Sequence, residues 1–127
     1  MLKVYFRWRR EPNRDAYKLR VDKKEKYLSV DWYEYFLGVN SKLTEKQILN
    51  LIKEALIQRN YTPKNSGVFS FHSVAKIKSI NTKDIIFDVK RTDKKSSHSG
   101  IFPKPIRLYD SEKIAKTVQK IIPLENL

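Results

Sequence analysis

The sequence predicts an α+β fold, in which a small antiparallel sheet packs against two main helices and one short helix. Three observations support this. Apolar and polar residues alternate over residues 2–9 and again over residues 67–80, as in strands with one buried face. A helical apolar repeat begins at residue 44. The 127 residues, 40% of them hydrophobic, are enough for one domain, and we expect residues 1–127 to form it.

The first third of the chain is expected to contain two strands and a short helix. Residues 2–9 alternate as a strand, residues 11–26 form a long charged connection, and residues 26–30 are a second short strand. Asp31 with Glu34 three residues later is typical of a capping box, which predicts a helix over residues 32–37. Gly38 is a suitable residue to end it.

The clearest element is a helix that begins after Thr44. Thr44 and Gln47 have the spacing of a capping box, and Arg59, Asn60 and Pro63 supply stop signals. Apolar residues recur at helical spacing, so we expect one face to be buried. These residues are Ile48, Leu51, Ile52, Ala55 and Leu56.

The second half of the chain is expected to form a hairpin, a loop and a final helix. The strand over residues 67–80 would pair with a strand over residues 84–92. Residues 93–105 are polar and contain Gly and Pro, which predicts a long loop, and residues 106–109 a short edge strand. Asp110 or Ser111 would cap a helix that continues to Pro123, with Ile114, Val118, Ile121 and Ile122 on one side.

Charge is the strongest functional signal in the sequence. The chain has 27 Lys and Arg against 14 Asp and Glu, a net charge of +13, and a pI near 9.9. A compact body of that charge repels itself, so a polyanionic partner is expected, and nucleic acid is the commonest one. Residues 1–30 and 76–107 each carry a net charge of +6. The leading hypothesis is therefore a non-enzymatic module that binds the phosphate backbone of RNA or DNA without sequence specificity.

The expected phosphate contacts lie in the two basic segments. The predicted hairpin places Lys76 and Lys78 on the face that also carries His72. The full set is Arg7, Arg9, Lys76, Lys78, Lys90, Arg91, Lys94 and Lys95.

A second hypothesis is a metal-independent ribonuclease or toxin centred on His98. The segment 94–101 gathers two cations, three hydroxyls, a Gly and this imidazole, all of which can serve a phosphate or its proton transfers. His72 would be the second acid–base group, with Lys90 or Arg91 balancing charge in the transition state.

A third hypothesis is a basic subunit that binds an acidic protein. Its anchor would be the aromatic turn with Trp32, Tyr35 and Phe36, since large aromatic rings dominate interface energetics.

Several classes are excluded or disfavoured by composition. The absence of Cys excludes disulfides, thiolate zinc sites and cysteine nucleophiles. With two His and three Gly, we expect no metal, no nucleotide-binding glycine loop and no cofactor. No signal peptide and no apolar run of roughly 20 residues are found, so we expect a cytoplasmic protein without a membrane partner.

Two short strings resemble motifs of a known group of proteins. They are Leu28-Ser29-Val30-Asp31-Trp32 and Ser97-His98-Ser99-Gly100-Ile101. Both are similar to motifs in small, poorly characterised prokaryotic proteins of mobile-element and defence loci, in which a Leu-Ser-Val stretch precedes an aromatic turn and a His lies in a late loop. The resemblance implies a prokaryotic or phage setting and work alongside larger partner proteins. It implies no catalytic residue.

Overall fold

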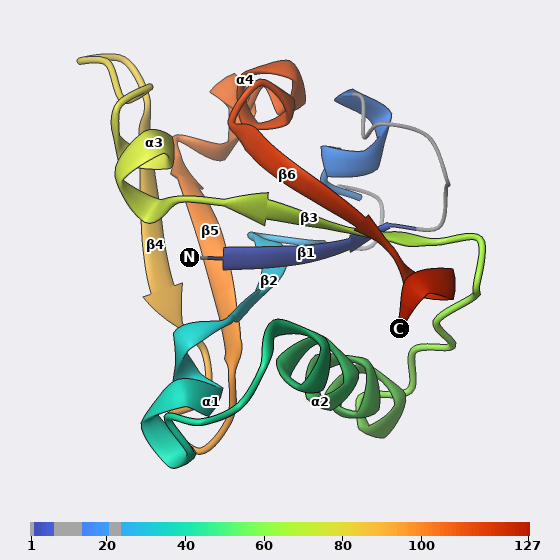
Figure 1. Ribbon diagram of the computed structural model, residues 1–127. Helices are drawn as coiled ribbons and strands as arrows, with labels where there is room; N and C mark the ends of the chain where they lie inside the picture. The colour runs from blue at the N-terminus through green and yellow to red at the C-terminus, as the bar shows by residue number, and fades with distance from the viewer. Residues whose placement is uncertain (1, 7–13, 21–23) are drawn as a thin grey trace.

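The computed structural model describes residues 2–6, 14–20 and 24–127, and within them the chain forms a six-stranded sheet (Figure 1). Its order is β4-β5-β2-β1-β3-β6, and every neighbouring pair is antiparallel. The strands are β1 (Leu2–Phe6), β2 (Leu28–Trp32), β3 (Val68–His72), β4 (Ile86–Arg91), β5 (His98–Lys104) and β6 (Val118–Pro123).

The helices are short, with one exception. The α-helices are α1 (Glu34–Val39), α2 (Glu45–Gln58), α3 (Val74–Lys78) and α4 (Ser111–Ala115), and the 3-10 turns are η1 (Arg14–Tyr17), η3 (Ile106–Leu108) and η4 (Leu124–Asn126). The α+β class is confirmed, but the second main helix is not, because α2 is the one long helix among the described residues. No helix in this part of the chain is both long and apolar enough to cross a membrane.

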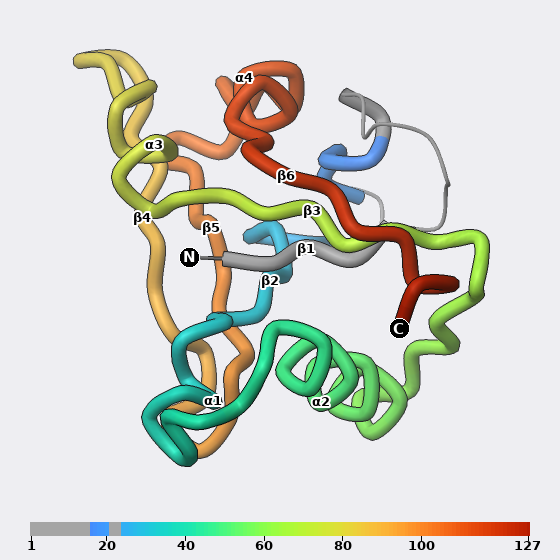
Figure 2. Tube along the Cα trace, viewed as in Figure 1, coloured from blue at the N-terminus to red at the C-terminus, as the bar shows by residue number. Residues whose placement is uncertain are grey.

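The sheet lies between two hydrophobic cores. Figure 2 shows α4 on one side of the strands and α2 on the other. The first core joins the sheet to η1, α3 and α4, through Tyr17, Ile77 and Ile114. The second joins the other face of the sheet to α2. Consecutive residues of β3, Val68 and Phe69, belong to different cores. Since successive side chains of a strand point to opposite faces, β3 is buried on both.

The helix predicted after Thr44 is confirmed. The Thr44 hydroxyl accepts a hydrogen bond from the backbone N–H of Gln47 at 3.2 Å, and the Gln47 side chain accepts one from the N–H of Thr44 at 2.8 Å. The buried face differs slightly from the predicted stripe, because Leu49 is fully buried whereas Leu51 and Ala55 are only partly so.

The predicted strands at residues 2–9 and 26–30 correspond to β1 and β2. Arg7 and Arg9 lie outside the described residues. The predicted cap at Asp31 is wrong. Asp31 belongs to β2 and is 4% exposed, and α1 begins after Tyr33 without a side-chain cap. A tertiary partner, described below, occupies its carboxylate.

The long strand predicted over residues 67–80 is wrong beyond His72. Ser73 ends it as the N-cap of α3, and its hydroxyl accepts a hydrogen bond from the N–H of Lys76 at 3.4 Å. The helix buries Ile77 in the first core. Lys76 and Lys78 are therefore on a helix and not on a hairpin strand.

The loop predicted over residues 93–105 is mostly strand β5, which lies between β2 and β4. The predicted strand at residues 84–92 is β4, but its partner is β5 and not β3. Ser99, Ile101 and Pro103 are buried. Pro103 is tolerated because β2 pairs with β5 only from His98 to Ile101, so the missing N–H breaks no hydrogen bond on that side.

The C-terminal prediction is right at its start and wrong afterwards. The Asp110 side chain caps α4 by accepting from the N–H of Glu112 at 3.0 Å. The helix ends at Ala115, and the residues that follow form β6 against β3. The neighbours Ile121 and Ile122 pack in different cores, as strand residues do. Residues 106–108, predicted as a strand, are the 3-10 turn η3.

Candidate nucleic-acid interface

The two short strings that the sequence singled out lie on neighbouring strands. In the register of β2 and β5, Ser29 faces Gly100 and Asp31 faces His98. Directly opposed residues of an antiparallel pair share one face of the sheet. Segments far apart in the chain therefore bring Ser29, Asp31 and His98 together on one face.

His98 is half-buried at the start of β5. Its Nδ1 is hydrogen-bonded to the Thr92 hydroxyl, and its Nε2 lies 3.4 Å from the Ser29 hydroxyl. Burial and the positive charge of Arg59 lower the pKa of His98, although Asp31 and Asp93 act in the opposite direction. The imidazole is therefore neutral near pH 7 and able to accept a proton.

Asp31 holds Arg59 from the end of α2. Its two carboxylate oxygens accept hydrogen bonds from the two terminal nitrogens of Arg59, each at 3.0 Å. The hydroxyl of Ser97 donates a third bond to Asp31, at 2.8 Å. Because each carboxylate oxygen accepts from one guanidinium nitrogen, Asp31 fixes one orientation of the guanidinium.

Two aromatic rings lie on the same sheet face, across Gly100. The centroids of Tyr27 and Phe102 are 4.6 Å apart and their planes are tilted by 35°. A Cβ atom at residue 100 would lie 2.6 Å from Cδ2 of Tyr27, so only Gly permits this packing. The Nζ atom of Lys90 lies 4.7 Å from the centroid of the Phe102 ring. We call the partly exposed group of Tyr27, Lys90, His98 and Phe102 the aromatic face.

The predicted phosphate contact Arg91 and the predicted protein anchors Trp32 and Tyr35 form one cluster. The Arg91 guanidinium carbon lies 5.1 Å and 5.6 Å from the ring centroids of Trp32 and Tyr35. Arg91 donates to the carbonyl of Lys94 at 2.6 Å, and the Tyr35 hydroxyl to that of Lys95 at 3.0 Å. This cluster shapes the turn that presents Lys94 and Lys95 to solvent.

Phe36, the third predicted protein anchor, packs against the second core and 5.2 Å from the Tyr35 ring. All three predicted anchors are only partly exposed. The acidic-protein hypothesis stays an untested prediction.

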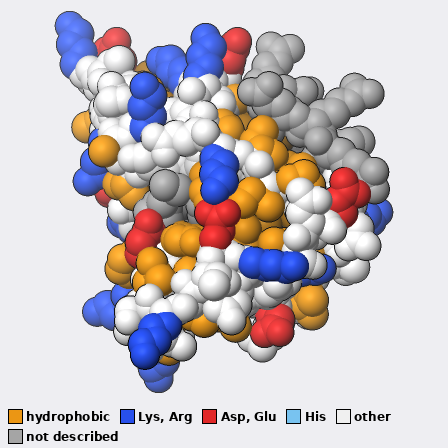
Figure 3. Space-filling view, viewed as in Figure 1, with side chains coloured by type: hydrophobic (Ala, Val, Ile, Leu, Met, Phe, Trp, Pro, Cys, Tyr) orange, Lys and Arg blue, Asp and Glu red, His pale blue; other side chains and the backbone are white. Residues whose placement is uncertain are grey.

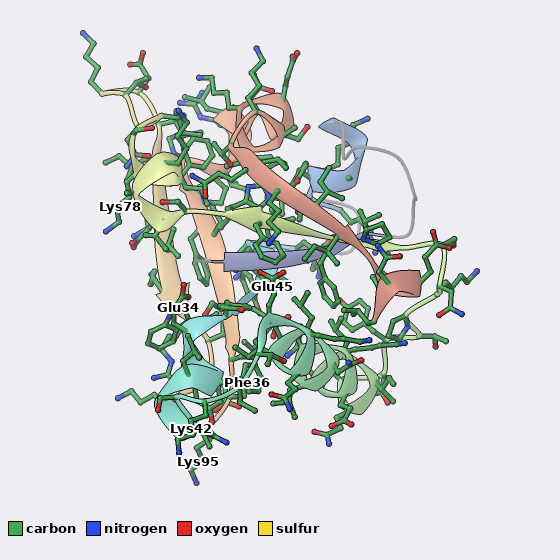
Figure 4. The ribbon with its side chains drawn as sticks, viewed as in Figure 1. Glu34, Phe36, Lys42, Glu45, Lys78 and Lys95 are labelled. Carbon is green, nitrogen blue, oxygen red and sulfur yellow. The ribbon has the colours of Figure 1, made fainter. Side chains whose placement is uncertain are left out.

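The predicted phosphate contacts fall into separate groups. Lys78 and Lys95 lie at opposite ends of the β4–β5 pair (Figure 4). Helix α3 packs Ile77 into the first core, whereas the aromatic face shares the other face of the sheet with Asp31, which binds Arg59 at the end of α2. Lys76 and Lys78, both exposed on α3, thus do not join the aromatic face. On the face drawn in Figure 3, Lys and Arg side chains stand mainly around the margin.

The structure does not bring the two histidines together. His72 is fully buried, with Nε2 3.0 Å from the Tyr17 hydroxyl and Nδ1 2.7 Å from the Thr117 hydroxyl. Its strand, β3, is three positions from β5 in the sheet, a separation of about 14 Å. His72 is therefore part of the core and gives His98 no second acid–base group.

Sequence reasoning missed Phe102, Ser29, Asp31 and Arg59 as candidate site residues. A signal for Phe102 was present, since it follows His98 and Gly100 at the period-two spacing of a strand face. Arg59 had none, because its position depends on where α2 docks.

Among the side chains that the structure describes, no three His, Asp or Glu gather closely enough to hold a metal ion. The resemblance to proteins of mobile-element and defence loci stays a prediction. Comparison with protein-family models, with curated proteins and with solved structures finds no match to this chain.

Proposed function

We propose that this protein binds single-stranded nucleic acid on its aromatic face. Bases would stack on Tyr27 and Phe102, while Lys90 and the neighbouring cations contact phosphates. The observation that carries the proposal is the Tyr27–Phe102 pair with the Lys90 ammonium against it, on a partly exposed sheet surface. Stacking suits unpaired bases, because a duplex hides its base faces.

The net charge of +13 supports the same proposal. Lys and Arg that neutralise phosphates release counterions, which gives affinity without sequence readout. Lys94 and Lys95 lie on the turn that joins β4 to β5 and extend the positive surface at one end of the aromatic face. The bound segment would therefore run along β4 and β5.

Binding of a fluorescent single-stranded oligonucleotide at several salt concentrations tests the proposal. Affinity should fall steeply with salt, and each base that loses its stacking partner should cost about 1–3 kcal/mol. Phe102→Leu keeps an apolar side chain but removes the ring, whereas Phe102→Tyr keeps the ring. We expect weaker binding by the first variant alone.

Lys90→Ala should also weaken binding and make it less salt-dependent. The matched control is Lys46→Ala, since Lys46 is exposed on α2, in another part of the molecule. Absent or salt-insensitive binding, or equal losses for Lys46→Ala and Lys90→Ala, would contradict the proposal.

A second candidate, RNA cleavage at His98, is favoured by the position of that imidazole between Thr92 and Ser29. Its lowered pKa leaves it unprotonated near pH 7 and able to accept the proton of a ribose 2′-hydroxyl. The Arg59 charge that helps to lower this pKa would also stabilise the negative charge that develops on the non-bridging phosphate oxygens as the 2′-oxygen attacks and the 5′-oxygen leaves, taking its proton from water.

Incubation of RNA with the protein in the presence of chelator tests this second candidate. Cleavage should leave 2′,3′-cyclic phosphate ends, spare DNA and fall by about 10²–10⁴-fold in His98→Ala. Equal activity of the two proteins, or none in either, would leave binding as the function.

A further inference from the structure

A pocket of about 130 Å³ lies beside the aromatic face. Described residues from three parts of the chain line it: residues 16–25 as far as the structure describes them (Ala16, Lys18, Arg20 and Glu25), strand β2, and the end of α2 with Tyr61 just beyond it. Its side chains include Lys18, Arg20, Glu25, Ser29, Asp31, Arg59 and Tyr61. We call it the Arg59 pocket. Ser29 connects it to the aromatic face, because its hydroxyl is 3.4 Å from Nε2 of His98.

The charges of the Arg59 pocket favour an anion. Lys18, Arg20 and Arg59 stand against the carboxylates of Glu25 and Asp31. Both carboxylates are already bound by the protein: Asp31 by Arg59, and Glu25 by Arg20, whose backbone N–H donates to it at 2.8 Å and whose Nε lies 3.5 Å from Oε1. The three cations still exceed the two carboxylates by one charge. A guanidinium has five N–H donors, and Asp31 uses two of those on Arg59.

The size of the pocket limits what enters it. Pockets that enclose a drug-sized ligand have volumes of about 300 Å³ or more, so this one admits a chemical group and not a whole nucleotide. Tyr61, 42% exposed, offers a ring beside it for the rest of the ligand. Arg is especially suited to phosphate because the planar guanidinium can donate two parallel N–H bonds to two phosphate oxygens.

We infer that the Arg59 pocket binds the terminal phosphate monoester of a nucleotide. The nucleotide is either free or at the end of a bound strand. If the phosphate belongs to the end of a bound nucleic-acid strand, the inference rests on the proposed function. If it belongs to a free nucleotide, the inference does not depend on the proposed function. A monoester dianion offers more charge to Arg20 and Arg59 than an internal diester does, so the pocket distinguishes a strand end from its interior.

Calorimetric titration with adenosine 5′-monophosphate and with adenosine measures phosphate recognition. Two oligonucleotides of one sequence, with and without a 5′-phosphate, show whether the bound phosphate belongs to a strand end or to a free nucleotide. We expect the phosphate to strengthen binding by about tenfold or more in at least one of the two comparisons. A preference between oligonucleotides assigns the pocket to a strand end, and a preference limited to the mononucleotide assigns it to a free nucleotide.

The double variant Lys18→Gln, Arg20→Gln should remove the phosphate preference, whereas Lys46→Gln should keep it. Thermal unfolding checks that both variants are folded. The inference is overturned if neither comparison shows a phosphate preference, or if the double variant retains it. Failure of the proposed function gives a different result. In that case the oligonucleotide without a 5′-phosphate would bind neither the wild type nor the double variant.

Discussion

The carboxylate of Asp31 and the guanidinium of Arg59 join strand β2 to the end of helix α2 through two hydrogen bonds of 3.0 Å. Asp31 is 4% exposed, and the Arg59 side chain 26%. Asp31, the buried partner, lies within the sheet, and Arg59, the more exposed partner, lines the Arg59 pocket. The same contact therefore supports the fold and shapes the pocket for which we propose phosphate binding.

Asp31→Asn should destabilise the protein by about 3 kcal/mol, because it leaves the Arg59 charge partly buried without its counterion. Urea denaturation measures the change in the free energy of unfolding. The control is Lys120→Gln, which breaks the exposed pair of Lys120 with Glu45, whose side chains are 52% and 39% exposed. That change should cost less than about 1 kcal/mol. Equal losses in the two variants would show that the Asp31–Arg59 pair adds nothing beyond a surface pair.

His72→Leu should reduce stability while leaving oligonucleotide binding unchanged. The hydroxyls of Tyr17 and Thr117 each lose a hydrogen-bond partner in the core, at a cost of about 1–3 kcal/mol. Thermal unfolding and oligonucleotide titration on the same samples separate the two effects. A folded His72→Leu protein with reduced affinity would place His72 in the binding surface after all.

Gly100→Ala should separate the two rings of the aromatic face. The new methyl would lie 2.6 Å from Cδ2 of Tyr27 and 2.8 Å from Cε1 of Phe102, so a ring must move. Overpacking of this kind costs about 1–3 kcal/mol of stability. We expect oligonucleotide affinity to fall as well. Gly38→Ala is the control, since the added methyl would meet nothing within 4 Å beyond its chain neighbours and the backbone of its own helix. Unchanged affinity in a folded Gly100→Ala protein would contradict a role for the paired rings.

Acidification should destabilise the protein partly through His98. Its pKa is lowered from 6.5 in the folded state, so the unfolded chain binds more protons in the pH range below that value. Stability therefore decreases as pH falls from 6.5 toward the folded-state pKa. His98→Gln should show a shallower decrease over this range in urea denaturation at several pH values. Parallel curves for the two proteins would mean that protonation of His98 is not linked to unfolding.

Elements with strong local signals were the ones that sequence could predict. The capping box of Thr44 and Gln47 involves residues three positions apart, and α2 formed as expected. Strand β5 has the composition of a loop, and it is a strand because β2 and β4 supply hydrogen bonds on both sides. No local pattern encodes those partners, so the local sequence around His98 predicts a loop.

Competition between local and tertiary partners accounts for two further errors. Asp31 has the spacing of an N-cap, but Arg59 and Ser97 bind its carboxylate. The alternation of residues 67–80 predicts Ser73 within a strand, but its hydroxyl caps α3. Of the candidate site, the sequence predicts His98, Lys90 and the overall positive charge. It could not identify which rings and cations share a face, because that depends on the sheet register.

The pairing of β2 with β5 has a kinetic consequence. Ser29 and Gly100 pair although they lie 71 positions apart, and contacts between residues so far apart in the chain slow folding. Neither half of the chain holds the complete surface, since Tyr27 and Ser29 come from one half and His98 and Phe102 from the other. Partly synthesised or partly unfolded chains thus lack the assembled surface, and if the proposed binding holds, oligonucleotide affinity will report on the completion of folding.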